Sequence, residues 1–199
     1  MAFSSRENTG RECVYAIVAT CYVACVTLAG PIRQIGYVVT DLDEALEGWV
    51  ALGVGPWYVI RGLRQSVVYR GEPCEVTISM ALANSGDMQI EVIHQHDDTP
   101  SVFTEFLASG RSGFHQLAYW TDDFDESMRS VRESGWPVVW IGGRQESADT
   151  RFAYVEPPGS PAAVIEIMEL TEVTAAMATF VREAATGWDG SDPIRELAV

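Results

Sequence analysis

Two glutamines and two glutamates recur at matching positions of an internal repeat. Residues 34–46 read QIGYVVTDLDEAL and align without a gap with residues 116–128, QLAYWTDDFDESM, so that Gln34 matches Gln116. Later in each half, IEVI at 90–93 and IEIM at 165–168 set Glu91 opposite Glu166. If a pseudo-two-fold axis relates the halves, four oxygen-bearing side chains converge on one site. Such oxygens suit a hard cation, and carboxylates can carry protons, so we look for function there.

The segments around these residues predict the same order of elements in both halves. Each half reads as a strand, a helix that starts at an aspartate, and further strands with alternating apolar residues. The expected strands are 32–40, 57–60, 67–69, 75–83 and 88–93 in the first half, and 114–121, 138–141, 151–156 and 163–170 in the second. The expected helices run from Asp41 through Trp49, over 124–134, and over 171–186.

This pattern predicts an α+β fold in which two tandem βαβββ modules form a curved mixed sheet around one cavity, plus a C-terminal helix. The expected division is an N-terminal extension of uncertain role at 1–30, module one at 31–95, a linker with a short helix at 96–112, module two at 113–170, and a C-terminal helix and tail at 171–199. We expect the turn-rich tail to lie over the surface.

Strand alternation predicts which side chains share the cavity with the four polar residues. The polar floor is expected to consist of Gln34, Glu91, Gln116 and Glu166, and the small Gly36 leaves room beside it. A substrate pocket would add Trp57, Met80, Ala118, Trp120 and Met168.

Alternation sets several nearby residues outside this cavity. His115 precedes Gln116 and is expected to point to the opposite face, and His94 and His96 are expected to face away from Glu91. Tyr37 and Tyr119 are interpreted as packing residues.

Composition limits the classes of partner. The chain has 199 residues, 47% of them hydrophobic, with 28 acidic against 13 basic residues and a net charge of −15. A globular protein this acidic, with no run of basic residues, is not expected to bind nucleic acid. Arg61, Arg64 and Arg70 form the nearest approach to a basic patch and are interpreted as solvated strand-end charges.

The first 30 residues leave three interpretations open. An apolar run at 13–28 is too short to predict a membrane span. It could be an element packed on the domain, a weak export signal ending near Ala29, or an upstream extension, which we favour. The four cysteines, Cys13, Cys21, Cys25 and Cys74, show no disulfide or zinc spacing, so we expect reduced thiols in a cytoplasmic protein.

The double pattern resembles the vicinal oxygen chelate superfamily, which includes glyoxalase I, methylmalonyl-CoA epimerase, extradiol dioxygenases and bleomycin-resistance proteins. The resemblance covers residues 32–170 and is closest to the epimerase-like branch, from QIGYVVTDLDEAL, QIEVI, GFHQLAYWTDD and AVIEIMEL. It implies that Gln34, Glu91, Gln116 and Glu166 bind a divalent metal, which could be Mg, Mn, Fe, Co or Ni. The alternative is a metal-free, hydrogen-bonded quartet in which the amides donate to the carboxylates.

The resemblance implies two functions of different classes. The first is a metal-assisted lyase or isomerase that moves a proton next to a carbonyl of a small apolar or CoA-linked substrate, with Glu166 and Glu91 as catalytic carboxylates. The second is non-catalytic sequestration of a hydrophobic small molecule. From Pro56 to Tyr69 there is no Asp or Glu, so the second base of an epimerase lacks a counterpart. The family also forms homodimers, and exposed first strands could pair across a dimer axis.

Overall fold

The computed structural model describes residues 28, 30–143 and 150–198. Apart from residues 28 and 30, the expected N-terminal extension lies outside the described residues. The export-signal interpretation and three of the four cysteines, Cys13, Cys21 and Cys25, therefore also lie outside them.

Strand, helix and three strands follow one another twice along the chain. The first set is β1 (Ile32–Val38), α1 (Leu42–Ala51), β2 (Trp57–Tyr69), β3 (Glu72–Ser85) and β4 (Met88–Gln95). After α2 (Val102–Ala108), the second set is β5 (Gly113–Thr121), α3 (Phe124–Glu133), β6 (Val138–Gly142), β7 (Phe152–Val155) and β8 (Val164–Glu169). The chain ends with α4 (Glu172–Ala185) and β9 (Ile194–Glu196).

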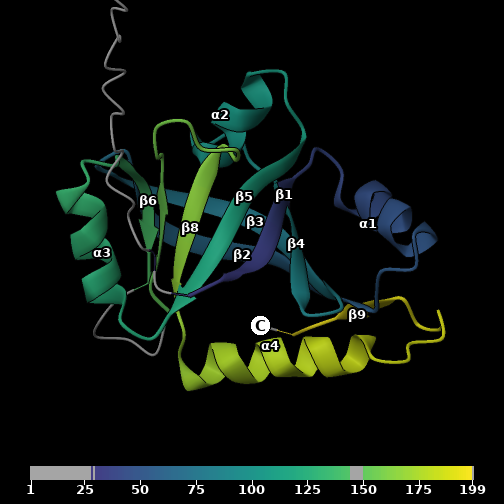
Figure 1. Ribbon diagram of the computed structural model, residues 1–199. Coiled ribbons are helices and arrows are strands. Elements are labelled where there is room, and N and C mark those ends of the chain that lie inside the picture. Colours follow the sequence, from purple (N-terminus) through teal and green to yellow (C-terminus); the bar gives the residue numbers. More distant parts are fainter. Residues whose placement is uncertain (1–27, 29, 144–149, 199) are drawn as a thin grey trace, which may run out of the picture.

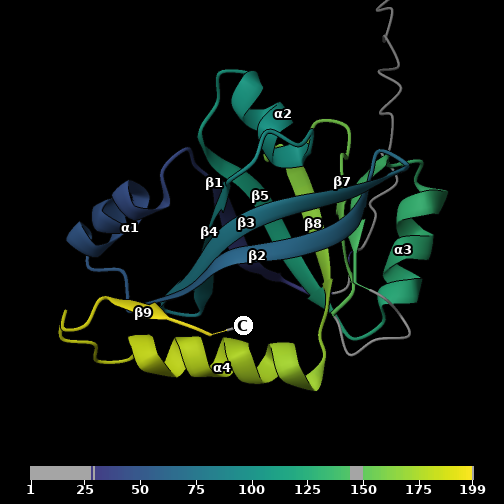
Figure 2. The same ribbon diagram turned by 180° about the vertical axis from the view of Figure 1, so that it is seen from behind.

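The strands form one sheet that closes on itself. Their order is β3-β4-β1-β5-β8-β7-β6-β2-β9, and β3 also pairs with β2. Closure depends on β2, which is one strand of 13 residues and not the two short strands expected. A register shift between Ile60 and Leu63 bends β2, and its far end then pairs with β6 of the other half through Val67, Val68 and Tyr69 (Figure 2). The predicted α+β fold with a curved sheet around one cavity and a C-terminal helix is confirmed.

The first strands of the two halves are central and paired on both sides. β1 lies between β4 and β5, and β5 lies between β1 and β8. The expectation that exposed first strands pair across a dimer axis is therefore wrong, because no open edge remains on either strand. The tail also differs from the expectation, because its β9 pairs in parallel with the start of β2.

The helices take positions that their caps and apolar faces explain. The carboxylates of Asp41 and Asp123 accept hydrogen bonds from the backbone amides of Glu44 and Glu126, which starts α1 and α3 by the same N-cap. These two helices pack on the outside of the sheet, whereas α2 and α4 lie at its opposite ends (Figure 1). Both are single-copy elements outside the repeat.

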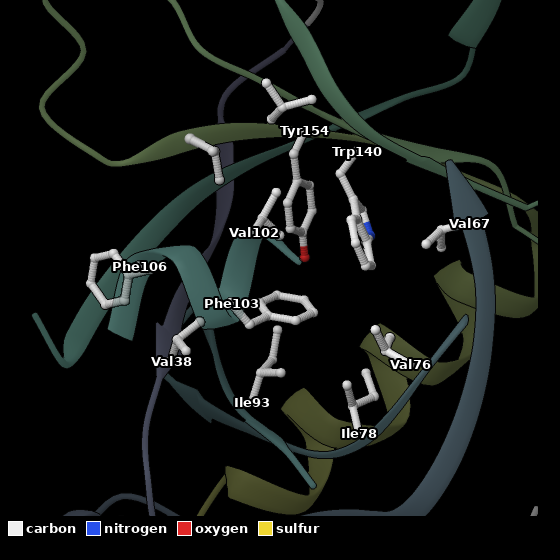
Figure 3. Packing of buried hydrophobic residues seen from close by; sticks show 12 residues of the cluster. Val38, Val67, Val76, Ile78, Ile93, Val102, Phe103, Phe106, Trp140 and Tyr154 are labelled. Atoms are coloured by element: carbon white, nitrogen blue, oxygen red, sulfur yellow. The ribbon is translucent and has the colours of Figure 1, made fainter. Parts of the chain in front are cut away.

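Three apolar clusters divide the core. One cluster fills the end of the interior below α2, where the rings of Phe103, Trp140 and Tyr154 meet Val38, Ile93 and Val164 (Figure 3). The second lies under α1 and contains Trp57 with Leu42 and Leu46. The third lies under α3 and contains Met128 and Ile167. None of these three clusters fills the α4 end of the interior.

Candidate functional site

Each first strand carries a bulge one residue before its glutamine. On β1, Ile32 pairs with Tyr119 and Gln34 with Ala118, so Arg33 is the extra residue. On β5, Gln116 pairs with Gly36 and Phe114 with Tyr37, so His115 is the extra residue. A bulge turns its extra side chain away from strict alternation. The expectation that His115 points to the opposite face from Gln116 is therefore wrong.

His115 and Gln116 instead lie together inside the sheet. His115 is 1% exposed and packs against the rings of Phe103 and Phe106 of α2. Its Nδ1 lies 2.6 Å from Oε1 of Gln116. Because an amide oxygen can only accept, the imidazole is the donor and fixes the orientation of the amide.

The amide of Gln116 joins three buried oxygen groups. Its Nε2 lies 3.0 Å from a carboxylate oxygen of Glu91, 3.2 Å from one of Glu166 and 3.0 Å from the hydroxyl of Tyr154. The two carboxylate oxygens can therefore be no more than 6.2 Å apart, the sum of their distances to the shared nitrogen. The space for this contact comes from Gly36, at which a Cβ would collide with Cδ of Gln116.

Gln34 has a different environment although it is the repeat equivalent of Gln116. Its Nε2 donates to Oε1 of the neighbouring Gln89 at 2.9 Å, not to a carboxylate. Its Oε1 is buried and has no hydrogen-bond partner among the described residues. Of the two amides in the expected quartet, Gln116 donates to both carboxylates and Gln34 donates to neither.

Burial changes the protonation of the two carboxyl groups. Desolvation raises the pKa of Glu166 to about 7, and the hydrogen bond from Gln116 moderates this rise. Desolvation followed by repulsion from Glu166 raises the pKa of Glu91 well above its usual range. The pair therefore takes up a proton at higher pH than exposed carboxyls do, because two adjacent buried carboxyls resist double ionisation.

A cavity of about 240 Å³ lies between these carboxyl groups and α4. Its polar residues are Gln34, Gln89, Glu91, Glu166 and Thr174, and Glu91 and Glu166 are the only titratable groups among its described lining residues. Its apolar walls are formed by Ile60, Met80, Leu82, Trp120, Met168, Val173, Met177 and Ala178. It is therefore a small apolar chamber with acidic groups at its base.

Most of the predicted site residues meet here. Gln34, Glu91 and Glu166 line the cavity, as do Met80, Trp120 and Met168 from the predicted pocket. Gln116 lies beneath the carboxyls and is fully buried, and Ala118 is buried between Gln34 and Glu166 without lining the cavity. The prediction for Trp57 is wrong, because its side chain packs under α1 and donates to the backbone carbonyl of Val54.

Alternation from Glu91 also predicts Gln89 at the cavity, where it bonds to Gln34. Two contributors were not expected from the sequence. Tyr154 bonds to Gln116. The second is α4, which covers the cavity with Val173, Thr174, Met177 and Ala178. The apolar face of α4 was visible in the sequence, but no pattern indicated which surface it would cover. Tyr154 could have been found from alternation, since it pairs with Glu166 across β7 and β8.

The donor set fits a hard divalent cation in part. Glu91, Glu166 and the unpartnered Oε1 of Gln34 offer oxygens around one cavity, which is the chemistry that such an ion requires. Gln116 presents its NH₂ group to the carboxylates and its oxygen to His115, so it could act as a ligand only after the amide rotates. In the described part of the chain, no three His, Cys, Asp or Glu side chains gather into a metal-binding group.

Comparison with known proteins agrees with this architecture. A family model of the glyoxalase/bleomycin resistance protein/dioxygenase superfamily matches residues 33–154, which is more than half of the chain. The chain therefore belongs to this superfamily. No curated protein sequence matches it.

Solved structures of similar fold include methylmalonyl-CoA epimerases. The epimerase from Mycobacterium tuberculosis has a TM-score of 0.52 and 24% sequence identity, over 75% of this chain and 94% of the epimerase. A methylmalonyl-CoA epimerase in complex with methylmalonyl-CoA and NH₄⁺ has a TM-score of 0.50 and 22% identity, over 71% and 95%. At these identities the likeness establishes the fold. No helix within residues 28, 30–143 and 150–198 is long and apolar enough to cross a membrane.

Proposed function

We propose that this chain is a glyoxalase-like enzyme that moves a proton at a carbon next to a carbonyl of a small, mainly apolar substrate. The observation that carries the proposal is the pair of buried carboxyls, Glu91 and Glu166, at the base of an apolar cavity. Burial raises the pKa of both groups, and a pair with one group protonated and the other ionised holds a base and an acid side by side, which is what such a transfer needs.

The two carboxyls have different roles, which are set by their protonation states. Ionised Glu166 takes the proton from the carbon, and the electron pair of the broken C–H bond moves onto the carbonyl oxygen as an enolate. Protonated Glu91 donates a hydrogen bond to that oxygen, which stabilises the developing charge in a site of low polarity. Return of the proton from Glu166 to the carbon skeleton completes the cycle and restores the enzyme.

Gln116 and His115 act as positioning residues. The amide of Gln116 donates to one oxygen of each carboxyl. The other oxygen of each carboxyl remains available to a ligand in the cavity. His115 holds the amide in this orientation and stays neutral, because burial lowers its pKa to about 4. Neither side chain lines the cavity, so neither is expected to contact the substrate.

The opposite wall argues against a two-base epimerase and for a lyase or an isomerase that works on one face of the substrate. Inversion at carbon needs a second acid or base on the far side of the substrate. There the cavity has Ile60 of β2 and Val173, Thr174 and Met177 of α4, and none of these side chains titrates. The hydroxyl of Thr174 is also engaged, with the backbone carbonyls of Glu169 and Thr171. Proton removal and return would therefore occur on one face.

A divalent cation would be held by Glu91, Glu166 and Oε1 of Gln34. When bound, it would supply Lewis-acid polarisation of a carbonyl oxygen. Metal content of the purified protein by plasma emission, compared with that of a Glu91→Ala/Glu166→Ala variant, tests this part of the proposal. About one ion per chain that is lost in the variant would support it, and no uptake of Mn²⁺, Co²⁺ or Ni²⁺ by the native protein would reject it.

Exchange of substrate hydrogen with solvent tests the proton transfer directly. Ketones and acyl thioesters are incubated with the protein in D₂O, and deuterium at the carbon next to the carbonyl is followed by NMR. Glu166→Gln should slow the exchange by about 10³-fold, the scale of a lost general base. Glu172→Gln, on the exposed face of α4, is the matched control and should leave the rate unchanged. Exchange by Glu166→Gln at the native rate would reject the assignment.

The walls of the cavity also support the second candidate, a protein that binds a hydrophobic molecule without changing it. Met80, Met168 and Met177 line the same chamber, and flexible thioethers adapt to ligands of different shape. Saturable binding of an apolar ligand, with no exchange by the native protein, would favour this function over catalysis.

A further inference from the structure

A second cavity, of about 140 Å³, lies between α4 and the sheet, beside the first. The two cavities share Gln89, Trp120 and Ala178, so they adjoin along the helix at a small side chain. Besides these three, its walls are formed by Arg33, Asn84, Asp87, Leu170, Ala175, Thr179 and Arg182. Leu170, Ala175, Thr179 and Arg182 lie beyond the residues that match the family model.

Two solvent-exposed arginines line this cavity, Arg33 of β1 and Arg182 of α4. Arg33 is the extra residue of the bulge on β1 and is exposed, unlike the buried His115 at the equivalent bulge. Arg182 comes from the last turn of α4. The cavity thus contains cations from both its sheet wall and its helix wall.

Neither arginine forms an ion pair with any residue that the structure describes. Six of the ten described arginines do: Arg61, Arg64, Arg70, Arg129, Arg151 and Arg195. Of the four that do not, two line this one small cavity.

Polar atoms without partners gather at the same place. Nε1 of Trp120, which lines both cavities, is a buried donor with no acceptor in the described part of the chain. Oδ1 of Asn84, which also lines this cavity, is a buried acceptor without a donor among the described residues, and Asn84 is 6% exposed. Unpaired buried polar atoms are costly, so a ligand that satisfies them would gain affinity.

We propose that the cavity between Arg33 and Arg182 is the subsite for an anionic group of the ligand, a carboxylate or a phosphate. The two guanidinium groups and the indole N–H supply donors to the anion, and Asp87 at the rim leaves the subsite with a net positive charge of one. The acceptor on Asn84 adds a requirement for a donor group, such as a hydroxyl, on the same ligand.

This subsite deepens the proposed function, because the identification of the bound anion as a substrate rests on it. The reacting carbonyl would lie over Glu91 and Glu166, and the anionic end would extend past Ala178 to the arginines. The substrate class is then a small, mainly apolar acid or phosphate ester, and not a neutral ketone.

Isothermal titration calorimetry at low salt with three probes of similar length tests the subsite: pentanoate, butyl phosphate and pentanamide. The native protein should bind at least one anion roughly tenfold more tightly than the neutral amide, which corresponds to about 1.4 kcal/mol. The tighter of the two anions then distinguishes carboxylate from phosphate. Added salt should weaken binding of the anion and leave the amide unaffected.

An Arg33→Gln/Arg182→Gln variant should lose the preference for the anion, whereas Arg132→Gln, an arginine of α3 outside both cavities, should keep it. Circular dichroism of each variant checks that α4 remains folded. Equal binding of anion and amide by the native protein, no binding of any probe, or a preference that survives the double substitution would each overturn the subsite.

The two proposals fail in different ways. Glu166→Gln should leave anion binding intact. Anion binding without proton exchange would therefore overturn only the proposed catalysis, and exchange on neutral ketones without anion preference would overturn only the subsite.

Discussion

The two halves of the sheet place a glutamine at the same position, yet the two side chains have different environments. Gln116 is fully buried and bonds to His115, Tyr154 and both carboxyls. Gln34 bonds only to Gln89 and leaves its oxygen unpartnered within the described part of the chain. The repeat therefore fixes where each side chain starts, but not what it contacts.

The difference arises from the two single-copy helices. At the α2 end, Phe103 and Phe106 fill the interior and pack against His115, which lies next to Gln116. At the α4 end the interior stays hollow, and the equivalent bulge residue, Arg33, faces a cavity. Both halves line the cavity, but the supporting contacts of Gln116 and His115 come from the second half alone.

The largest effect of breaking this asymmetry should come from Gln116. Gln116→Leu removes the shared donor from Glu91, Glu166 and Tyr154 while all three stay buried. We expect a loss of about 4 kcal/mol of unfolding free energy at pH 8, the scale for leaving a buried charge without its partner. Denaturant unfolding measures this, and a loss below about 1 kcal/mol would show that the amide bridge does not support the carboxyls.

The carboxyl pair should also make stability depend on pH. The pKa of Glu166 rises from 4.5 to about 7 on folding, so the folded state holds more protons than the unfolded state between these values. Its contribution is fully favourable below pH 4.5 and is lost as pH rises through 7, by about 3 kcal/mol in all. The raised pKa of Glu91 extends the loss to higher pH.

His115 has the opposite sign over nearly the same range. Its pKa falls from 6.5 to about 4 on folding, so its contribution is lost as pH falls, not as pH rises. The test is therefore the difference between the native protein and Glu166→Gln, measured by denaturant unfolding from pH 4 to 8. A difference that does not change with pH would contradict the raised pKa of Glu166.

Gly36 and Ala118 are equivalent positions of the repeat, but only the position of Ala118 has room for a Cβ. A Cβ at Gly36 would meet the side chain of Gln116, whereas Ala118 already carries its Cβ because Gln34 turns toward Gln89. We expect Gly36→Ala to cost about 2 kcal/mol through displacement of Gln116. Thermal unfolding measures the cost, and Gly48→Ala, at an open position of α1, is the control.

The smallest effect should come from Gln34. Gln34→Leu breaks one hydrogen bond but also removes a buried acceptor that lacks a donor among the described residues, so stability should change by less than about 1 kcal/mol. A loss comparable to that of Gln116→Leu would show that the two halves are equivalent after all.

Sequence predicted the arrangement of the repeat well because its determinants are local. The aspartate caps, the alternation along the strands and the matched glutamines and glutamates all act within a few residues, and they place Gln34, Glu91 and Glu166 around one cavity. The bulges at Arg33 and His115 could not be predicted, because they are set by pairing with a distant strand. Trp57 was misplaced because an aromatic residue on a strand suits either face, and here α1 determines which face is covered.

Closure of the sheet has a consequence for the kinetics of folding. The pairs β1–β5 and β2–β6 each join segments roughly 70 to 90 residues apart, so neither half can complete its hydrogen bonding alone. Contacts of such long sequence separation must overcome the entropy of chain closure before they stabilise the protein. We therefore expect the two halves to fold in one slow, concerted transition, and the site between them to form only when that transition is complete.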